Sequence, residues 1–366
     1  MNKHIKLSKQ SKKLLFSGIT AAALALVVGG PHAVKADSVS GSTLAAQSLN
    51  TKAATKNPVT AFDAKGRTLT PSLAPSKKAR PFKAPNGVKG KVTTKASNDV
   101  DVWMPDKNLQ EVVAYNLYGD AKSVDKITKD DLANLKDLQI IEGSSESKEF
   151  YEAALSIKSL KGLEYATKLE NIDLAPDTNL NVQYFGMQNI LLHSALSDIS
   201  ALANLTNIES VNFQQSSIYD ISALANKPKL TSVYLSYNNI TDFSPLGKDP
   251  NLASSRVMGY FQSVEANGYY VSKSSTPTLT LVYSNITGID GKPMQLRIAN
   301  DPTGQDKYVR YYASTWNNPG VVNGQQVAWN ISGLTPNTGK MLYMTVKYTG
   351  SAGEGGWFIV PFMVVD

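Results

Sequence analysis

Three aspartates recur at one spacing and are the residues of this sequence that come closest to a catalytic set. Asp198, Asp220 and Asp242 follow one another at equal intervals, and repeats of equal length bring equivalent residues side by side. Paired carboxylates about 5–10 Å apart catalyse glycoside hydrolysis. Each aspartate also precedes a serine by two residues, however, which is typical of a turn. We therefore interpret all three as turn residues and expect a protein that is not an enzyme.

Other residue types that could do chemistry are scarce. The sequence has no cysteine, so thiolate chemistry and cysteine metal sites are excluded. His4 and His32 lie near the amino terminus, and no Ser-x-Gly nucleophile motif accompanies the third histidine, His193. Residues 338–340 are Thr-Gly-Lys, but the glycine spacing before them is one residue too long for a phosphate loop. The sequence thus indicates no catalytic residue, no metal site and no cofactor.

The aspartates belong to a repeat with a period of twenty-two, in which eight positions keep their chemical type. The first copy is Ile208, Val211, Phe213, Ser216, Ile218, Asp220, Ile221 and Leu224, and the second is Leu230, Val233, Leu235, Asn238, Ile240, Asp242, Phe243 and Leu246. The pattern matches the leucine-rich repeat, in which each unit must stack on its neighbours to bury its apolar side. It predicts a solenoid with parallel β-structure on the concave side, and a short helical turn at Ser244-Pro245 on the convex side.

The repeat is irregular before and after these two copies. The acidic stretch 142–152 is predicted to be a loop, and the period fails between Leu174 and Leu191, where the gap is shorter than one period. Either Asn189 and Leu191 or Ile190 and Leu192 face inward there, and the choice stays open because a one-residue slip turns every side chain over. After the second copy, one more full period matches Val257 to Leu235 and puts Ser255 in the place of Val233. We assign residues 141–265 to the repeats.

Two helices are expected ahead of the repeats. Leu109, Val112, Val113 and Leu117 form one helical stripe, which Pro105 opens and Gly119 closes. Thr128 and Asp131 form a pair like a capping box, and Leu132, Leu135 and Leu138 follow at helical spacing. An array of repeats needs a cover for its first apolar edge. Residues 100–140 are therefore predicted to be a helical cap.

The carboxyl-terminal third has the pattern of a β-sandwich. Short alternating runs separated by turn residues predict strands at 279–283, 294–298, 308–312, 326–330, 342–348 and 357–364. With no cysteine pair, packing alone must hold this domain together. We assign residues 266–366 to the sandwich.

The amino-terminal residues carry the basic charge of the chain. Residues 1–36 contain a lysine-rich start, an apolar run over 19–28 and small residues before Asp37, which predicts a secretory signal peptide and not a transmembrane anchor. Residues 37–99 hold eleven basic and three acidic residues and few large apolar ones, so we expect a disordered basic linker of about +8. It is either a solvated spacer or a polycation that contacts an anionic cell wall. Residues 100–366 hold twenty basic and twenty-seven acidic residues, which does not favour nucleic acid as a partner.

Several of these stretches resemble the internalin-like leucine-rich-repeat proteins of Gram-positive bacteria. The resemblance lies in Met-Pro-Asp-Lys-Asn-Leu-Gln-Glu at 104–111, Ile-Thr-Lys-Asp-Asp-Leu at 127–132, Ser-Leu-Lys-Gly-Leu-Glu-Tyr-Ala at 159–166, Asp-Ile-Ser at 220–222, Asp-Phe-Ser-Pro-Leu at 242–246, Val-Ala-Trp-Asn at 327–330 and Gly-Trp-Phe at 356–358, with Pro361. It implies a multidomain fold of helical cap, leucine-rich-repeat solenoid and Ig-like β-sandwich. It also implies a secreted or surface-attached, non-catalytic binding protein. No sorting motif follows the last predicted strand, so covalent wall anchoring is not expected.

The repeats also predict where a ligand binds. The residues between the inward strand positions form a column of Asn212, Tyr234 and Arg256, flanked by Ser210, Ser232 and Ser254 on one side and by Gln214, Ser236 and Met258 on the other. Exposed Tyr and Arg side chains are typical of binding hot spots, although an ordinary solvated sheet surface has the same pattern. We expect an adhesin-like protein that binds a host or bacterial surface protein or glycan on this concave face. The alternatives are a wall-associated structural protein and a wall-glycan hydrolase.

Overall fold

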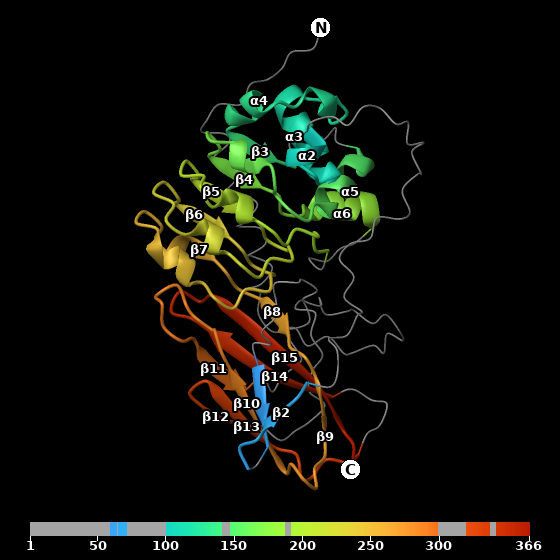
Figure 1. The fold of residues 1–366 in the computed structure, drawn as a ribbon, viewed down its shortest axis with the longest axis vertical. Helices are drawn as coiled ribbons and strands as arrows, with labels where there is room; N and C mark the ends of the chain where they lie inside the picture. Colours follow the sequence, from blue (N-terminus) through green and yellow to red (C-terminus); the bar gives the residue numbers. More distant parts are fainter. Residues whose placement is uncertain are drawn as a thin grey trace. The chain divides into compact units, whose positions relative to one another are not determined.

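The computed structural model describes residues 59–63, 65–71, 100–140, 147–186, 192–298, 320–336 and 342–366 (Figure 1). The predicted signal peptide lies outside these residues. Among them no helix is both long enough and apolar enough to cross a membrane. The helices are α2 (Val100–Trp103), α3 (Lys107–Tyr118), α4 (Lys129–Ala133), α5 (Lys148–Ser156) and α6 (Thr178–Phe185).

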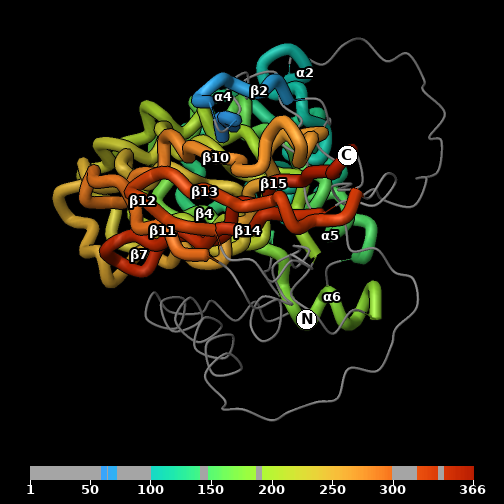
Figure 2. The backbone as a smooth tube through the Cα atoms, turned by 90° about the horizontal axis from the view of Figure 1, so that it is seen from below, coloured from blue at the N-terminus to red at the C-terminus, as the bar shows by residue number. Residues whose placement is uncertain are grey.

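The strands form three sheets. Their bounds are β1 (Val59–Phe62), β2 (Thr68–Leu69), β3 (Asp137–Gln139), β4 (Asn171–Asp173), β5 (Ser210–Asn212), β6 (Ser232–Tyr234), β7 (Val257–Met258), β8 (Gln262–Glu265), β9 (Tyr269–Val271), β10 (Thr278–Tyr283), β11 (Gln295–Ile298), β12 (Val321–Asn323), β13 (Gln326–Asn330), β14 (Leu342–Thr349) and β15 (Gly355–Val364). One sheet, β3-β4-β5-β6-β7, is parallel throughout. It is the sheet of a leucine-rich-repeat fold, and Figure 2 follows the same chain from a second direction.

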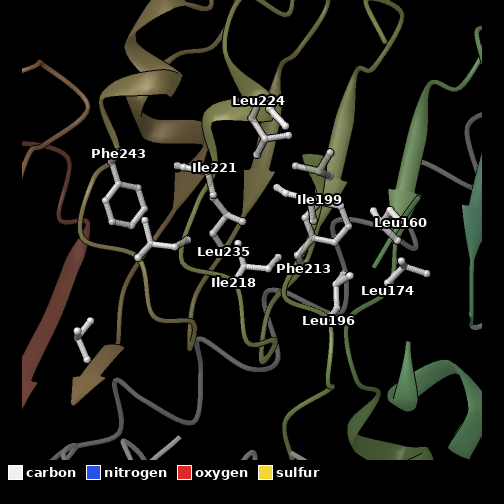
Figure 3. Packing of buried hydrophobic residues seen from close by; sticks show 14 of the residues in the cluster. Leu160, Leu174, Leu196, Ile199, Phe213, Ile218, Ile221, Leu224, Leu235 and Phe243 are labelled. Carbon is white, nitrogen blue, oxygen red and sulfur yellow. The ribbon is translucent and has the colours of Figure 1, made fainter. Parts of the chain in front are cut away.

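The repeat register expected from the sequence is confirmed at its clearest point. Val211 of β5 pairs with Val233 of β6, which is the predicted period. All eight positions of both copies are buried except Asp220 and Asp242. Their apolar side chains meet in one core between successive repeats, shown in Figure 3 for residues such as Phe213, Leu235 and Phe243. The turn at Ser244 is a short 3₁₀ helix, Ser244–Lys248, with Pro245 in its first turn.

One buried amide in each of the last two repeats closes the bend that follows the strand. The side-chain amide of Asn238 donates to the carbonyls of Phe213 and Leu235, and its Oδ1 accepts from the backbone N–H of Ile218 at 2.9 Å. Gln262 repeats the arrangement in the next repeat: its amide donates to the carbonyl of Leu235 at 2.8 Å. Buried backbone groups must be paired, so these side chains replace the missing ladder bonds.

The last step of the array is two residues longer than the predicted period, and the prediction is wrong there. Val257, not Ser255, pairs with Val233. Gly259 consequently stands where Leu235 stands in the repeat before. A Cβ on Gly259 would lie 2.6 Å from the Phe243 ring, so the ring fills the space of the missing side chain.

The start of the array also differs from expectation. Leu138 is not helical, because α4 ends at Ala133 and Leu138 is the inward residue of the first strand, β3. The stretch predicted to be a loop contains the beginning of α5, which Ser147 caps. At Leu138 the pattern misleads because an apolar residue every three positions fits a helix until the next short strand begins.

The irregular gap is an insertion and not an extra strand. Strand β4 pairs directly with β5, with Ile172 opposite Val211, so the residues between them add no strand to this sheet. The insertion contains α6, and its Asn181 accepts a hydrogen bond from the buried hydroxyl of Tyr151 at 2.8 Å. Residues 189–191 lie outside the described part of the chain. Leu192 is buried, which agrees with the register in which Ile190 and Leu192 face inward.

The predicted position of α3 and the predicted capping pair of α4 are confirmed, although α4 is shorter than expected. Helix α3 starts after Asp106, whose side chain accepts from the backbone of Asn108 and Leu109, and it ends at Gly119 in the left-handed conformation. Thr128 caps α4 and donates its hydroxyl to Asp131 at 2.6 Å. Leu109, Val112 and Val113 are fully buried, whereas Leu117 is only half-buried.

Two further sheets enclose the buried side chains of the carboxyl-terminal strands. One has the order β12-β13-β10-β1-β2, and the other has the order β11-β14-β15-β8, with β9 also paired to β15. The rings of Tyr283 and Phe358 meet between them, 5.2 Å apart. Strands β10, β11, β13, β14 and β15 correspond to predicted runs. The predicted run 308–312 lies outside the described residues.

Two strands come from the segment predicted to be a disordered linker, and for these residues that prediction is wrong. Strand β1 pairs antiparallel with β10, with Val59 opposite Tyr283 and Phe62 opposite Thr280. Val59 and Ala61 are buried in the core. A strand of four residues in a polar segment leaves too little periodicity to recognise.

Strand β8 belongs both to the last repeat and to the sheet β11-β14-β15-β8. Its Gln262 closes the repeat bend, and the same residue pairs in parallel with Gly356 of β15. A Cβ on Gly356 would clash with the Gln262 carbonyl oxygen, so only glycine allows this approach. Nearby, the hydroxyl of Tyr348 donates to the carbonyl of Ile240 at 2.7 Å.

Replacing Leu109 tests how much the first helices stabilise the array. Leu109→Ala should lower the free energy of unfolding by about 2–5 kcal/mol, because the side chain is fully buried. Leu117→Ala is the matched control on the same helix and should cost clearly less, since Leu117 is half-buried. Urea unfolding measures both. Equal losses would show that α3 does not pack as described.

Replacing Asn238 tests the buried amide at the repeat bend. Asn238→Ala should lower the free energy of unfolding more than the same change at half-buried Asn212. The reason is that it leaves several buried backbone groups unpaired, and each such group costs about 1–3 kcal/mol. Thermal unfolding of the two variants gives the comparison. A smaller loss for Asn238→Ala would contradict the role of the amide.

Candidate ligand-binding face

The side of the parallel sheet that points away from the core is the candidate binding face, called here the sheet face. Strand pairing places one outward residue of each strand in a central column. The column is Gln139, Asp173, Asn212, Tyr234 and Met258. Each of these side chains is partly exposed. Neighbouring residues in such a column are roughly 4.8 Å apart.

Two of the three residues predicted for this column are placed in it, and the third is not. Asn212 and Tyr234 are paired neighbours. Arg256 is two residues out of register because of the longer last step, and it lies in the exposed 3₁₀ turn Ser254–Arg256 that precedes β7. Met258 takes the place predicted for Arg256 and is paired with Tyr234.

The predicted flanking residues divide into those on the face and those engaged elsewhere. Ser232 pairs with Ser210 in the flanking column, as expected. Ser236 is buried, only 2% exposed, and its hydroxyl donates to the carbonyl of Met258. Gln214 is turned to its neighbour, since both its backbone N–H and its side-chain amide donate to the Asn212 oxygen at 3.3 Å.

Aromatic residues that sequence reasoning missed lie just beyond the strands. Tyr237 and Phe261 each directly precede the buried amide of their repeat, and both have positive φ, 62° and 59°. Their rings stack 4.9 Å apart at 17°. Tyr260 lies beside them, with its ring 6.4 Å from that of Phe261. The longer last step hid this pattern, because the regular period aligns Tyr237 with Gly259.

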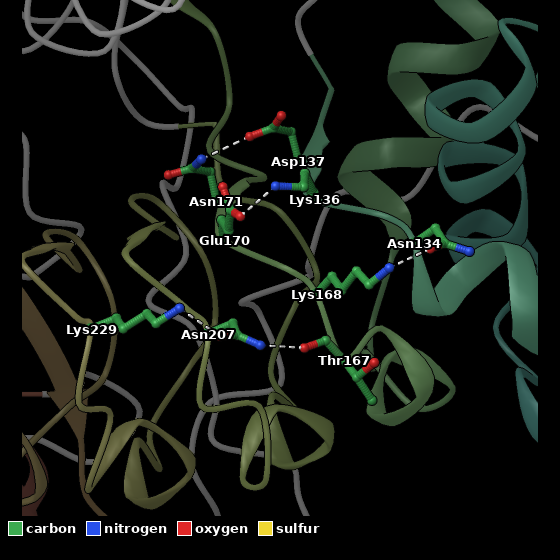
Figure 4. A network of polar contacts seen from close by, with 9 residues as sticks. All are labelled: Asn134, Lys136, Asp137, Thr167, Lys168, Glu170, Asn171, Asn207 and Lys229. Carbon is green, nitrogen blue, oxygen red and sulfur yellow. Dashed lines mark hydrogen bonds and ion pairs between the residues drawn. The ribbon is translucent and has the colours of Figure 1, made fainter.

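The amino-terminal end of the sheet face is polar and internally bonded (Figure 4). Lys136 and Glu170 form an ion pair at 2.8 Å, and the Asn171 amide donates to Asp137 at 2.7 Å. These contacts link successive repeats along the edge of the sheet. The sheet face therefore has a polar end over β3 and β4 and an aromatic end over β6 and β7.

Asp173 is the titratable group with the most altered environment on the sheet face. Burial raises its pKa to about 7, and the Asp177 carboxylate adds to the rise. Hydrogen bonds from the backbone of Ala175 and from the side chain of Asn212 act in the opposite direction. The pKa of Asp173 is therefore raised toward neutral pH in the middle of the sheet face.

The three repeating aspartates are held as turn residues, as predicted. Oδ1 of Asp198, Asp220 and Asp242 accepts the backbone N–H of the serine two residues later at 3.0, 2.8 and 2.9 Å. For Asp198, burial raises the pKa, but hydrogen bonds from Ser159 and Ser200 lower it overall.

His193 also has a structural place in the array. Its Nδ1 lies 3.2 Å from the carbonyl oxygen of Ser216, which belongs to the next repeat. This contact joins two repeats, and it gives the ring no nucleophile to activate.

Comparisons with known proteins find likeness at the level of solved structures. No family model matches the sequence, and no curated protein matches it. The functional domain of InlJ from Listeria monocytogenes, which includes a cysteine ladder, is 18% identical with a TM-score of 0.39. That match covers 65% of this chain and 45% of that one. The CBM51-2 and INT domains of ZmpB from Clostridium perfringens are 16% identical with a TM-score of 0.30, covering 45% of this chain and 30% of theirs.

A third similar structure is the InlP protein of Listeria monocytogenes. It is 14% identical with a TM-score of 0.22, and the match covers 75% of this chain and 100% of that one. The chain spans less than half the length of the InlJ and ZmpB structures. InlJ and InlP are internalins, the family that the repeats of this sequence resemble. Unlike the InlJ domain, this chain has no cysteine with which to build a ladder.

The raised pKa of Asp173 predicts how stability depends on pH. A carboxyl group with a higher pKa in the folded state binds protons preferentially when folded, so its contribution is present below about pH 4 and is lost as the pH rises through about 7. Asp173→Asn should remove the loss of stability between pH 6 and 7.5, as measured by urea unfolding. Part of the loss of stability should remain at lower pH in this variant, because burial also raises the pKa of Asp249, to about 6.

Asp220→Asn is the matched control for Asp173→Asn, because Asp220 is an exposed aspartate of the same array. It should keep the parent's pH dependence. A parent protein whose stability is constant from pH 6 to 7.5 would contradict the environment described for Asp173.

Proposed function

We propose that this protein is a secreted, non-catalytic binding protein of the adhesin type, and that it holds its ligand on the aromatic end of the sheet face. The observation that carries the proposal is the gathering there of half-buried apolar side chains. They are Tyr234, Tyr237, Met258, Tyr260 and Phe261. Aromatic residues and methionine are enriched at protein interfaces, where charged residues are depleted.

The chemistry of this end favours a partner with apolar groups. Tyr234 and Met258 are neighbours across two strands. A tyrosine ring offers a wide contact surface with a polar tip, and a methionine adapts its shape to the partner. The surface fits an apolar side chain of a surface protein or the face of a sugar ring. Arg256, exposed next to β7, can pair with an acid at the edge of the contact.

The remaining parts have supporting roles in this proposal. Helices α2 to α4 act as the cap of the solenoid, supported by the contact of Trp103 with Tyr165, whose rings lie 5.5 Å apart. The two carboxyl-terminal sheets form the Ig-like domain of an internalin-like protein. The lysine-rich start and apolar run over residues 1–36 direct secretion.

Retention on an anionic cell wall through the basic residues of 37–99 is a second role that the sequence favours. The motivating observation is their charge of about +8. Such retention would weaken with salt. We do not propose a wall-glycan hydrolase, because the repeating aspartates are bonded within their own turns.

Replacing Tyr234 and Met258 together tests the proposed binding end. Partners are first captured from surface proteins and from a glycan array with the full chain. Tyr234→Ala with Met258→Ala should then weaken binding by about 2 kcal/mol or more, roughly thirty-fold, because both side chains lie at the centre of the patch. Circular dichroism shows whether the double variant folds.

Tyr270→Ala is the control, since Tyr270 is an exposed tyrosine on β9, away from the sheet face. It should bind like the parent. A folded double variant with unchanged affinity would place the ligand elsewhere. Loss of binding in Tyr270→Ala alone would place it on the β9 side of the carboxyl-terminal domain.

A further inference from the structure

The β1–β2 hairpin forms the edge of a sheet to which it is connected only distantly along the chain. Its neighbour β10 comes much later in the sequence, with the helices and all repeats between. Strand β10 is paired on its other side with β13. Without the hairpin, β10 would be an open edge with unpaired backbone groups, which readily accepts another strand.

The hairpin is held together by its own contacts. Asp63 accepts from the backbone N–H of Lys65 and of Arg67 at 2.9 and 2.8 Å, and Arg67 Nε pairs with its other oxygen at 2.6 Å. Strand β2 pairs back onto β1 through Ala61 and Phe62. The hairpin can therefore leave β10 and return to it as one unit.

Its attachment to the rest of the protein is short. Four residue pairs join β1 to β10. Val59 and Ala61, two small side chains, are the hairpin's fully buried apolar residues. The hydroxyl of Tyr269 donates to the Val59 carbonyl at 3.2 Å. An edge element that is joined to its sheet by one short strand pairing is among the parts of a structure that can open locally.

The tether that follows the hairpin is long. Residues 72–99 join it to α2. A chain of this length can span at most about 90–100 Å. The covalent connection between the hairpin and α2 therefore does not by itself prevent the hairpin of one molecule from pairing with the β10 edge of another.

We propose that the β10 edge is a strand-acceptor site and that its partner is the β1–β2 hairpin of a second copy of this chain. Exchange replaces each contact by an identical one, so it costs little beyond association. The tether keeps a molecule's own hairpin at high local concentration, so exchange grows with protein concentration. It is favoured where copies are crowded, as they would be on a surface. This site is separate from the sheet face.

The absence of cysteine from the sequence allows a direct test with full-length chains. Thr60 and Val282 are opposite each other in the β1–β10 pair, at a separation that a disulfide can bridge. Chains carrying Thr60→Cys and differently tagged chains carrying Val282→Cys are mixed, held below the unfolding temperature and oxidised. A disulfide between the two tags forms in register only when the hairpin of one chain pairs with β10 of the other.

The control mixture replaces Val282→Cys by Thr278→Cys. Thr278 lies four residues along β10, about 13 Å from the position opposite Thr60, which is too far for a disulfide. We expect roughly tenfold more mixed dimer in the test mixture than in the control. We also expect the yield to rise roughly tenfold or more when protein concentration rises about a hundredfold.

A second arm places both changes, Thr60→Cys and Val282→Cys, in one chain. At low concentration it should give a monomer with an internal disulfide, which confirms the pairing of β1 with β10. Equal yields in the two mixtures, yields that do not depend on concentration, or no mixed dimer would each overturn the exchange. Failure of the internal disulfide would overturn the acceptor site itself.

Discussion

A leucine-rich repeat has one apolar side and cannot keep it from water alone, and the rest of this structure depends on that constraint. Within the array, each repeat covers the next, and the bend after each strand needs partners for its buried backbone groups. Asn238 and Gln262 supply them in the last two repeats. At the end of the array, the carboxyl-terminal part of the chain provides the cover: the backbone N–H of Phe243 donates to the carbonyl of Thr287, and β8 continues the final repeat into the next sheet.

This junction also fixes the proposed binding end. The stack of Tyr237 and Phe261 continues to Trp357 of β15, whose ring lies 5.9 Å from that of Phe261 at 8°. The Lys347 Nζ lies over the Trp357 ring, 5.3 Å from the ring centre. Stacked rings and a cation above them resist displacement more than isolated side chains do. The aromatic end of the sheet face is thus held both by the repeats and by β15.

The sequence predicts the fold well where a period repeats without a gap and poorly where a gap is small. The step from Val211 to Val233 is recognisable because all eight positions recur. The two extra residues before β7 cannot be recognised from the sequence, because Val257 is apolar and fits the place of either Val233 or Leu235. Gly259 gives no sign either, since it does not resemble Leu235, whose place it takes. Leu138 satisfies both a helical and a strand period. Strand β1 has its partner beyond the whole repeat array, and its short alternation carries no mark of that pairing.

The same two-residue shift changes the chemistry of the candidate site. A column of Asn212, Tyr234 and Arg256 would offer a tyrosine beside a fixed positive charge, suited to an acidic partner. The structure instead places Met258 beside Tyr234 and adds Tyr260 and the Tyr237–Phe261 stack. Binding by such a surface draws its free energy from apolar burial, which has no preferred charge and little direction. Selectivity must then come from shape and from polar groups, such as the Tyr234 hydroxyl within the patch and Arg256 at its edge.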